Sequence, residues 1–254
     1  MTTTETLPHR GRFPWLLTLL SLASLVVLLG LGTWQVQRLA WKDDLVATIN
    51  SRLTLPPVPL DDALKAPEGV SGQEYRPVTV EGQFRHQFER HFFATHDGAT
   101  GYFVYTPLLR DQGDWVFVNR GFVPFEMKDA AKRAEGQVEG HVRVSGLLRT
   151  AIAEKPSSLV PDNDLAKNIF YWKDIRDMAA SSGLPSDAPV LGLFVDADKT
   201  PNPGGWPIGG VTLIELPNNH LQYAVTWYGI AAALGGVYLA MIARWWRGAA
   251  KVHT

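Results

Sequence analysis

The stretch "FPWLLTLLSLASLVVLLGLGTW" (residues 13–34) decides the architecture, because it is one of two long uncharged apolar runs near the ends of the chain. The other is "LQYAVTWYGIAAALGGVYLAMIA" (residues 221–243). At about 1.5 Å per residue, a helix of this length spans roughly 30 Å, the thickness of a bilayer's hydrocarbon core. Tyrosines and tryptophans at the ends of the second run are typical of membrane–water interfaces. We predict transmembrane helices at residues 13–34 and 220–243.

Each run has a second interpretation. The first could be a cleaved signal peptide, but its length and the following "GTWQVQR" (residues 32–38), a poor cleavage site, favour an uncleaved anchor. The second could be a buried helix of a soluble protein, but its aromatic ends favour the membrane. A stripe of small residues, Ala232, Gly236 and Ala240, could pack against the first helix, although such residues are common in membrane helices.

Basic residues flank the outer ends of both runs: Arg10, Arg12, Arg244, Arg247 and Lys251. Cytoplasmic loops carry an excess of such residues, so residues 1–12 and 244–254 are predicted to be cytoplasmic tails. Residues 35–219 would then form a periplasmic β-rich domain of a two-pass protein in a bacterial plasma (inner) membrane. Arg38 and Lys42 oppose this orientation weakly, since Asp43 and Asp44 follow them.

The composition excludes several classes of function. The formal net charge of -1 argues against a nucleic-acid-binding protein. The absence of cysteine removes disulfides, thiolate chemistry and covalent haem attachment through C-x-x-C-H. Phosphate-binding loops and hydrolase or metalloprotease motifs are also missing from the sequence.

The segment between the runs has the pattern of a β domain. Alternating or aromatic stretches predict strands at residues 76–84, 90–98, 101–109, 114–122, 141–148, 191–198 and 211–216. Helical spacing of Ile175 and Met178, followed by Gly183, predicts a short helix within residues 171–183. The predicted fold class is two transmembrane α-helices flanking a mainly antiparallel β extracytoplasmic domain with a short helix, built as a small barrel or a sandwich.

Three histidines and two aspartates in this domain are spaced so that they could form a functional site. His86, His91 and His96 recur every five residues, which could suggest metal ligands, but odd spacing alternates the faces of a strand. We interpret them as surface or turn residues. Asp196 and Asp198 share a strand face and are interpreted as a solvated strand end.

More candidate binding residues cluster where the two predicted helices leave the membrane. Trp34, Arg38 and Trp41 share one face of the first helix, and an arginine is expected at the interface, because it costs about 3 kcal/mol at the bilayer centre. On the second helix, His220, Tyr223, Ala224 and Trp227 share a face at the same predicted depth. Imidazole, aromatic faces and an arginine suit haem, with His220 on the iron. Ordinary aromatic belts and a snorkelling arginine explain the same residues.

Six motifs appear in the order seen in the surfeit-locus family of cytochrome c oxidase assembly factors, as in a bacterial member. They are "LGTWQVQRLAWK", "YRPVTVEGQF", "GYFVYTPL", "VFVNRGFVP", "VSGLL" and "NNHLQYAVTWYG", within residues 31–229. Phe122 stands where a tryptophan is expected. The chain therefore resembles this family over most of its length, with both apolar runs in place.

The resemblance implies a non-enzymatic assembly factor for haem-copper oxidase that binds haem a, transiently, and supports its insertion into the large oxidase subunit. The family's histidine before the second helix matches His220, the expected ligand of the haem iron. Trp34, Gln35 and Arg38 match the first-helix motif, and Asn119 to Gly121 match a domain motif whose glycine is expected to serve a turn or a close approach.

The expected partners are the large haem-bearing oxidase subunit, the haem a synthesis enzyme and membrane lipids, with no nucleic acid; a homo-oligomer stays open. Haem a against haem b is not decided by the sequence. Two alternatives also stay open: a membrane scaffold that binds oxidase subunits without haem, and an envelope enzyme of unknown reaction.

Overall fold

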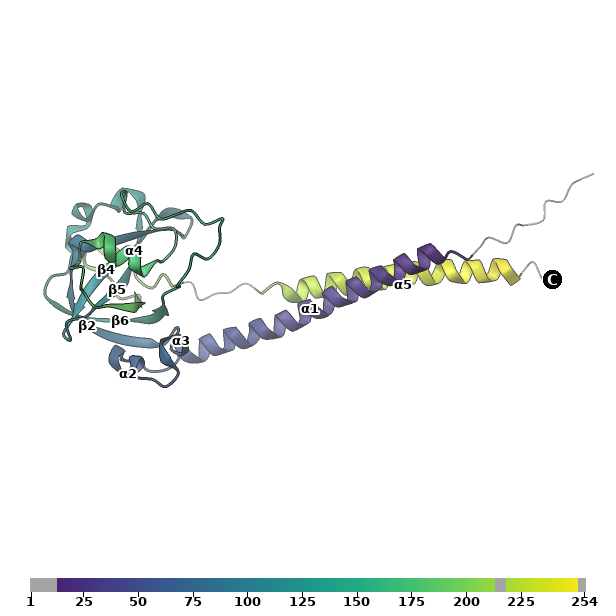
Figure 1. The fold of residues 1–254 in the computed structure, drawn as a ribbon, viewed down its shortest axis with the longest axis horizontal. Helices are drawn as coiled ribbons and strands as arrows, with labels where there is room; N and C mark the ends of the chain where they lie inside the picture. Colours follow the sequence, from purple (N-terminus) through teal and green to yellow (C-terminus); the bar gives the residue numbers. More distant parts are fainter. Residues whose placement is uncertain (1–12, 213–217, 251–254) are drawn as a thin grey trace, which may run out of the picture. The chain divides into compact units, whose positions relative to one another are not determined.

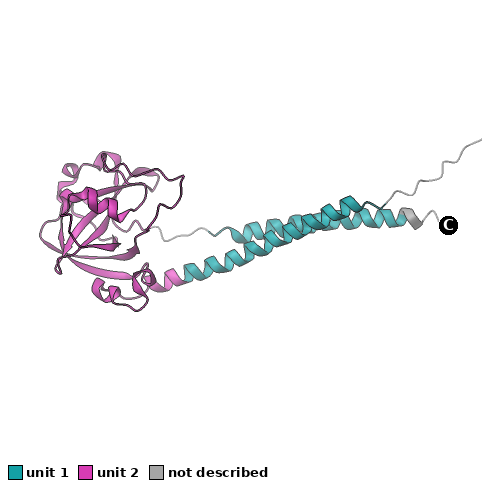
Figure 2. Ribbon diagram, viewed as in Figure 1, with its two compact units in different colours: residues 1–47, 215–254 teal, residues 48–214 magenta. Residues whose placement is uncertain are grey.

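The computed structural model describes residues 13–212 and 218–250, and the chain divides into two compact units (Figures 1 and 2). The first, called the helix pair below, comprises the described parts of residues 1–47 and 215–254. The second, called the β domain, comprises the described parts of residues 48–214. The predicted cytoplasmic tail at residues 1–12 lies outside the described residues.

The helix pair consists of α1 (Trp15–Leu53) and α5 (His220–Ala250). Both helices are long and apolar enough to cross a membrane, and only 17% and 6% of their most apolar windows are buried. A core helix of a soluble protein would be mostly buried, so these exposed apolar surfaces fit a two-pass membrane protein. Helix α1 continues without a break from the apolar run to Leu53, and from Thr48 onward it belongs to the β domain.

Contacts between α1 and α5 are made by a glycine and by hydroxyl groups. A Cβ placed on Gly32 would lie 2.7 Å from the ring of Tyr228, so the absent side chain makes room for the tyrosine. The Tyr228 hydroxyl forms a 3.1 Å hydrogen bond with Thr33 Oγ1. Ala224 and Ala231, seven residues apart, are buried on α5. The predicted stripe of small residues at 232, 236 and 240 is not buried against α1.

The β domain contains one seven-stranded sheet (Figure 1). The strands are β1 (Val58–Pro59), β2 (Pro77–Phe84), β3 (Arg90–His96), β4 (Ala99–Arg110), β5 (Trp115–Pro124), β6 (His141–Thr150) and β7 (Val190–Ala197). Their order is β1-β2-β6-β7-β5-β4-β3, and β2 also pairs with β4. This additional pairing closes β2, β6, β7, β5 and β4 into a barrel, which removes the edges of those strands.

The mainly antiparallel fold with a short helix is confirmed. Only β1–β2 and β5–β7 are parallel pairs. Strands β4 and β5 form the hairpin expected around "RDQGD", with Leu109 opposite Trp115. Of the predicted strand at residues 211–216, the first two residues are not in a strand, and residues 213–216 lie outside the described part of the chain.

Short helices cover the barrel: α2 (Leu60–Leu64), α3 (Gly69–Gly72), η1 (His86–Phe88), η2 (Phe125–Met127), η3 (Ala130–Gly136), α4 (Ile175–Ser182) and η4 (Pro203–Gly205). Helix α4 begins where the Asp174 side chain accepts hydrogen bonds from the first-turn amides. It ends at Gly183, whose φ of 84° is the left-handed conformation expected after a helix. The sequence predicted the end of this helix at Gly183, whereas the helix begins at Ile175, inside the predicted range 171–183.

The core lies on both faces of strand β5, which explains why nine of its ten residues are buried. Val116 and Val118 belong to a cluster that also contains Val80 and Leu108. Phe117, pointing the opposite way, belongs to a second cluster with Phe170, Met178 and Phe194. Because alternate residues point to opposite faces, a strand covered on both sides has a continuous apolar sequence rather than an alternating one.

Candidate functional site

The candidate site of the helix pair is centred on His220, the first residue of α5. Its Nδ1 lies 2.6 Å from Oε1 of Gln35 on α1. Gln35 is 9% exposed, a low value for an amide on an apolar helix. A buried amide needs a hydrogen-bond partner, and the imidazole supplies it, so the contact fixes both side chains in the seam between the helices.

Trp34 and Arg38 lie beside this contact. The Trp34 ring meets the imidazole of His220 edge-on, with centroids 6.5 Å apart, and about half of the tryptophan side chain is exposed. Arg38 is one helical turn further along α1 and places its guanidinium 3.8 Å from the ring centroid of Trp41. The structure thus joins His220, Gln35 and Trp34, and leaves Arg38 stacked on its neighbour.

Tyr223 and Trp227 do not touch the imidazole. Tyr223 is 55% exposed, Trp227 is half-buried, and neither forms a hydrogen bond or ring contact with His220 in the described part of the chain. Ala224 is the residue of that face that turns toward the interior of the helix pair. Tyr223 and Trp227 therefore provide aromatic surface on α5 without positioning the histidine.

The hydrogen bond to Gln35 determines what His220 can do chemically. An amide oxygen can only accept a hydrogen bond, so the donor is Nδ1, which carries the hydrogen. Nε2 then carries the lone pair of the neutral ring. Nε2 has no hydrogen-bond partner among the residues that the structure describes. A histidine oriented through one ring nitrogen, with the other free, has the arrangement of metal-bound imidazoles, whose second nitrogen usually donates to an oxygen. The residues present fit a single axial ligand for haem iron.

Spacing did not single out Gln35 or Tyr228. Trp34, Arg38 and Trp41 share a helix face, and Gln35 entered only through the resemblance. Tyr228 resembled one more aromatic of an interfacial belt. The available signal was Gly32 in "GLGTW", because a glycine inside a membrane helix often marks the place where a neighbouring helix approaches.

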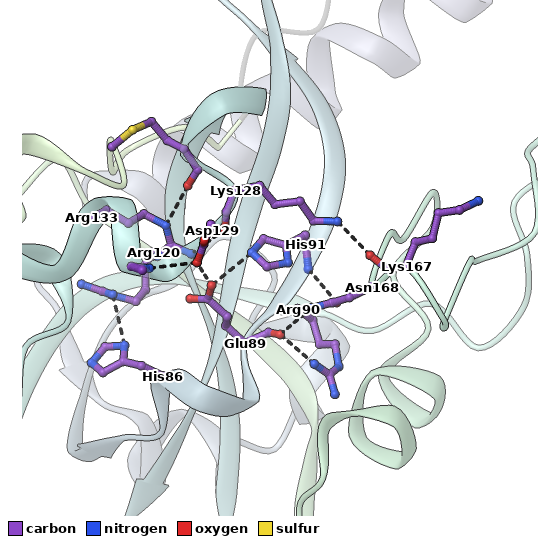
Figure 3. Close-up of polar contacts among 12 residues, drawn as sticks. His86, Glu89, Arg90, His91, Arg120, Lys128, Asp129, Arg133, Lys167 and Asn168 are labelled. Atoms are coloured by element: carbon purple, nitrogen blue, oxygen red, sulfur yellow. Dashed lines mark hydrogen bonds and ion pairs between the residues drawn. The ribbon is translucent and has the colours of Figure 1, made fainter.

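The β domain holds a second polar group, shown in Figure 3. His91 Nε2 lies 3.1 Å from Oε1 of Glu89, and Arg133 forms an ion pair with the same carboxylate oxygen. Glu89, His91 and Arg133 are each at most 6% exposed. The prediction that His91 is a surface or turn residue is therefore wrong. Strand β3 is covered by residues 125–136 and 168–170, which are distant in sequence.

His86 and His96 do not join His91 in a metal site within the described residues. His86 lies in η1 and contacts Val138 O at 2.8 Å and Arg120 Nη1 at 3.4 Å (Figure 3). Burial lowers the pKa of both His86 and His91, because it disfavours the charged imidazolium. For Glu89, burial raises the pKa, but the bonds from His91 and Arg133 outweigh it and the net shift is downward.

The prediction that Asp196 belongs to a solvated strand end is also wrong, whereas Asp198 is exposed as predicted. Asp196 is 2% exposed. Its carboxylate accepts hydrogen bonds from Asn119 Nδ2 at 3.1 Å and from Arg149 Nη1 at 3.2 Å. Such a buried charge is retained only when it is paired, and this one ties β5 to β6 and β7.

The motif "VNRG" is now explained residue by residue. Asn119 bonds Asp196 and, through Oδ1, the amide of Gly121. Gly121 has φ of 124°, and a Cβ there would lie 1.9 Å from the carbonyl oxygen of Ile208. The glycine thus permits the close approach that was expected. Arg120 is fully buried and donates to Gly136 O at 2.6 Å and to Asn202 Oδ1 at 2.7 Å.

Comparisons with known proteins agree with the motifs. Residues 22–232 match the SURF1 family. The chain is 37% identical to Surfeit locus protein 1 of Homo sapiens and 36% identical to that of Rattus norvegicus, covering 86% and 85% of this chain and 74% and 72% of those proteins. It is 40% identical to the SURF1-like protein of Monosiga brevicollis, over 82% of this chain and 80% of that protein. The chain therefore belongs to the SURF1 family, the surfeit-locus family of cytochrome c oxidase assembly factors.

Proposed function

We propose that this chain supports the assembly of haem-copper cytochrome c oxidase by holding haem a at His220 and passing it to the large oxidase subunit. The observation that carries the proposal is the 2.6 Å contact between His220 Nδ1 and Gln35 Oε1, which orients the ring and leaves Nε2 free. Haem would supply an iron with an axial position open to an imidazole.

The neighbouring side chains suit the rest of a haem. Trp34 and Tyr223 each expose more than half of an aromatic side chain, which can pack against a flat macrocycle. Arg38 makes no ion pair with a carboxylate in the described part of the chain, and its only recorded partner is the face of Trp41. A propionate would be a stronger partner, because an arginine–carboxylate pair joins charge to hydrogen bonding.

The open character of the site supports a carrier rather than an enzyme or a permanent haem protein. A single imidazole from this chain and exposed flanking aromatics would hold haem without enclosing it, so that a partner could take it up. A closed cage with two ligands would bind more tightly and release more slowly. The large oxidase subunit and the haem a synthesis enzyme are the partners that such a transfer requires.

The proposed location follows from charge. Arg244 and Arg247 on α5, together with the other basic residues of the two tails, support a cytoplasmic location for both tails, because cytoplasmic segments carry an excess of Lys and Arg. The start of α5 would then lie at the periplasmic side of a bacterial inner membrane, with the β domain in the periplasm. His220 and Arg38 would stand at the outer interface, where an arginine costs little.

The test is the absorption spectrum of detergent-purified protein from cells that make haem a. We expect wild-type protein to carry haem, His220→Ala to lose it, and Gln35→Leu to bind it more weakly by about 10- to 100-fold, as expected for loss of a partner that orients a metal ligand. His141→Ala, a change to an exposed histidine of the β domain, is the matched control and should leave the spectrum unchanged.

Two outcomes would contradict the proposal. An unchanged spectrum and haem stoichiometry in His220→Ala would remove the ligand. Colourless wild-type protein that still promotes oxidase assembly would favour the alternative of a scaffold that never binds haem.

A further inference from the structure

The further inference concerns a cavity in the β domain that Arg120 lines. The cavity has a volume of about 230 Å³. Its walls are mainly apolar and come from β2, β6, β7 and two loops: Phe84, Val138, Val142, Val144, Ala197 and Pro201. Pockets that bind small molecules combine such walls with a few polar groups that converge on the ligand. Here the polar groups include the guanidinium of Arg120, together with Ser145, Thr200 and Asn202.

Arg120 is a buried cation without a carboxylate partner. It is 2% exposed, and it forms no ion pair in the described part of the chain. Its recorded partners are the neutral acceptors Gly136 O, Asn202 Oδ1 and His86 Nδ1, and the face of Phe84 at 4.9 Å. Buried charges are normally paired, because desolvation costs several kcal/mol per ion. An unpaired one beside a cavity therefore indicates an anionic occupant.

Glu89, a neighbouring acid, does not serve as this partner. It is bound by Arg133 and His91, as Figure 3 shows, and within the described residues it acts on Arg120 only through its charge, without a hydrogen bond or ion pair. Burial lowers the pKa of Arg120 to about 10, which still leaves the side chain charged at neutral pH. The Nε–H of Arg120 has no hydrogen-bond partner among the described residues. A charge and a free donor are thus both available.

The lining of the cavity limits the chemistry of the occupant. Asp198 stands on the cavity wall, so its charge opposes any anion there, and it opposes a dianion such as phosphate about twice as strongly as a monoanion. Arg143, also on the wall, is paired with Glu81 and adds little net charge. The volume of about 230 Å³ lies below the roughly 300–1,000 Å³ of sites that bind drug-sized ligands, so the cavity suits a small molecule.

We propose that this cavity binds a carboxylate with a short apolar body, whose carboxyl group pairs with Arg120 while the body contacts the valine and phenylalanine walls. The same chemistry is offered by a free apolar acid and by the terminal carboxylate of a polypeptide that ends in an apolar residue. The binding site is separate from His220 and does not depend on haem.

The experiment is titration calorimetry on the full chain in detergent. The probes are 3-phenylpropanoate and its neutral analogue 3-phenylpropanamide. We expect the acid to bind wild-type protein at least tenfold more tightly than the amide, and Arg120→Gln to abolish that preference. Arg176→Gln, which removes an exposed arginine of α4 that does not line the cavity, should keep the preference within twofold. Acetyl-Gly-Gly-Leu with a free or an amidated C-terminus then distinguishes a chain end from a free acid.

A second variant tests the cavity while leaving Arg120 unchanged, so the proposal can still be tested if Arg120→Gln does not fold. Val142→Phe fills the cavity from its half-exposed wall and leaves Arg120 in place, so it should weaken the acid at least tenfold, with thermal unfolding as the check of folding. The proposal is overturned if neither the acids nor the peptide bind, if the acid and the amide bind equally, or if Val142→Phe, folded, binds the acid as wild type does.

Discussion

Replacing Gly121 by alanine should destabilise the β domain strongly, for two separable reasons. The residue has φ of 124°, a conformation that costs a non-glycine residue about 1–3 kcal/mol. The new Cβ would also lie 1.9 Å from Ile208 O, which is backbone and cannot rotate away. Relieving that overlap requires separating the two backbone segments that contain Gly121 and Ile208. These segments are joined by two backbone hydrogen bonds of 2.9 Å, one in each direction between Phe122 and Ile208.

The magnitude follows from these parts. Each backbone hydrogen bond contributes about 0.5–1.5 kcal/mol, so two lost bonds and the strained φ amount to roughly 2–6 kcal/mol. Domains of this kind have a total stability of about 5–15 kcal/mol. We therefore expect Gly121→Ala to lose a large fraction of the folded β domain's stability.

The assay is urea unfolding of the full-length protein in detergent, followed by tryptophan fluorescence, with Trp115 on β5 as a buried reporter. Gly98→Ala is the matched control. Gly98 also has a positive φ, 80°, but a Cβ there meets nothing within 4 Å, so it should cost only about 1–2 kcal/mol. If the two variants lose equal free energy of unfolding, the close approach is not the reason for glycine at 121.

Three further predictions concern other parts of the chain. Burial lowers the pKa of His86 and His91 below 6.5, so below that pH the unfolded chain binds more protons than the folded chain. The melting temperature of the β domain should therefore fall between neutral pH and about pH 5, and it should fall less steeply in His91→Gln. A rise in the melting temperature on acidification would contradict this. Asp196→Ala leaves buried donors unpaired and should cost about 3 kcal/mol in urea unfolding, whereas a loss near zero would mean that the pairing is dispensable. Tyr228→Phe removes the hydroxyl contact between α1 and α5 and should lower the stability of the helix pair by about 0.6–1.7 kcal/mol in detergent unfolding; no change would show that ring packing alone holds the helices there.

Local pattern was sufficient for strands β2 to β7 and for helix α4. Strands β4 and β5 were predictable because apolar residues flank a polar turn at residues 110–114, and α4 was predictable from its spacing and from Gly183. The closure of the barrel was not, because it depends on β2 pairing with β4 at one end while it pairs with β6 along most of its length. Nothing in the composition of β2 states which partners it will have.

Which polar residues are buried could not be predicted from the sequence. Asp196 follows an apolar strand, and its short-range context is that of a solvated strand end. It is buried because Asn119 and Arg149 come from neighbouring strands to satisfy it. The same holds for His91: its partner Glu89 is paired in turn with Arg133, which lies 44 residues further along the chain than Glu89. A polar residue's partners are set by topology, so its burial cannot be known before the strand order is.

At the membrane site the same limit had a different consequence. Helical spacing grouped Trp34 with Arg38 and Trp41, and that face proved to be the exposed flank of α1. The residue that meets His220 is Gln35, on the buried seam. The haem-transfer role proposed above would need both kinds of surface. The seam would have to hold the imidazole rigidly enough to present Nε2, and the flank would have to stay open enough for a partner to reach the haem. Spacing within one helix finds the flank, whereas the seam exists only when two helices pack together.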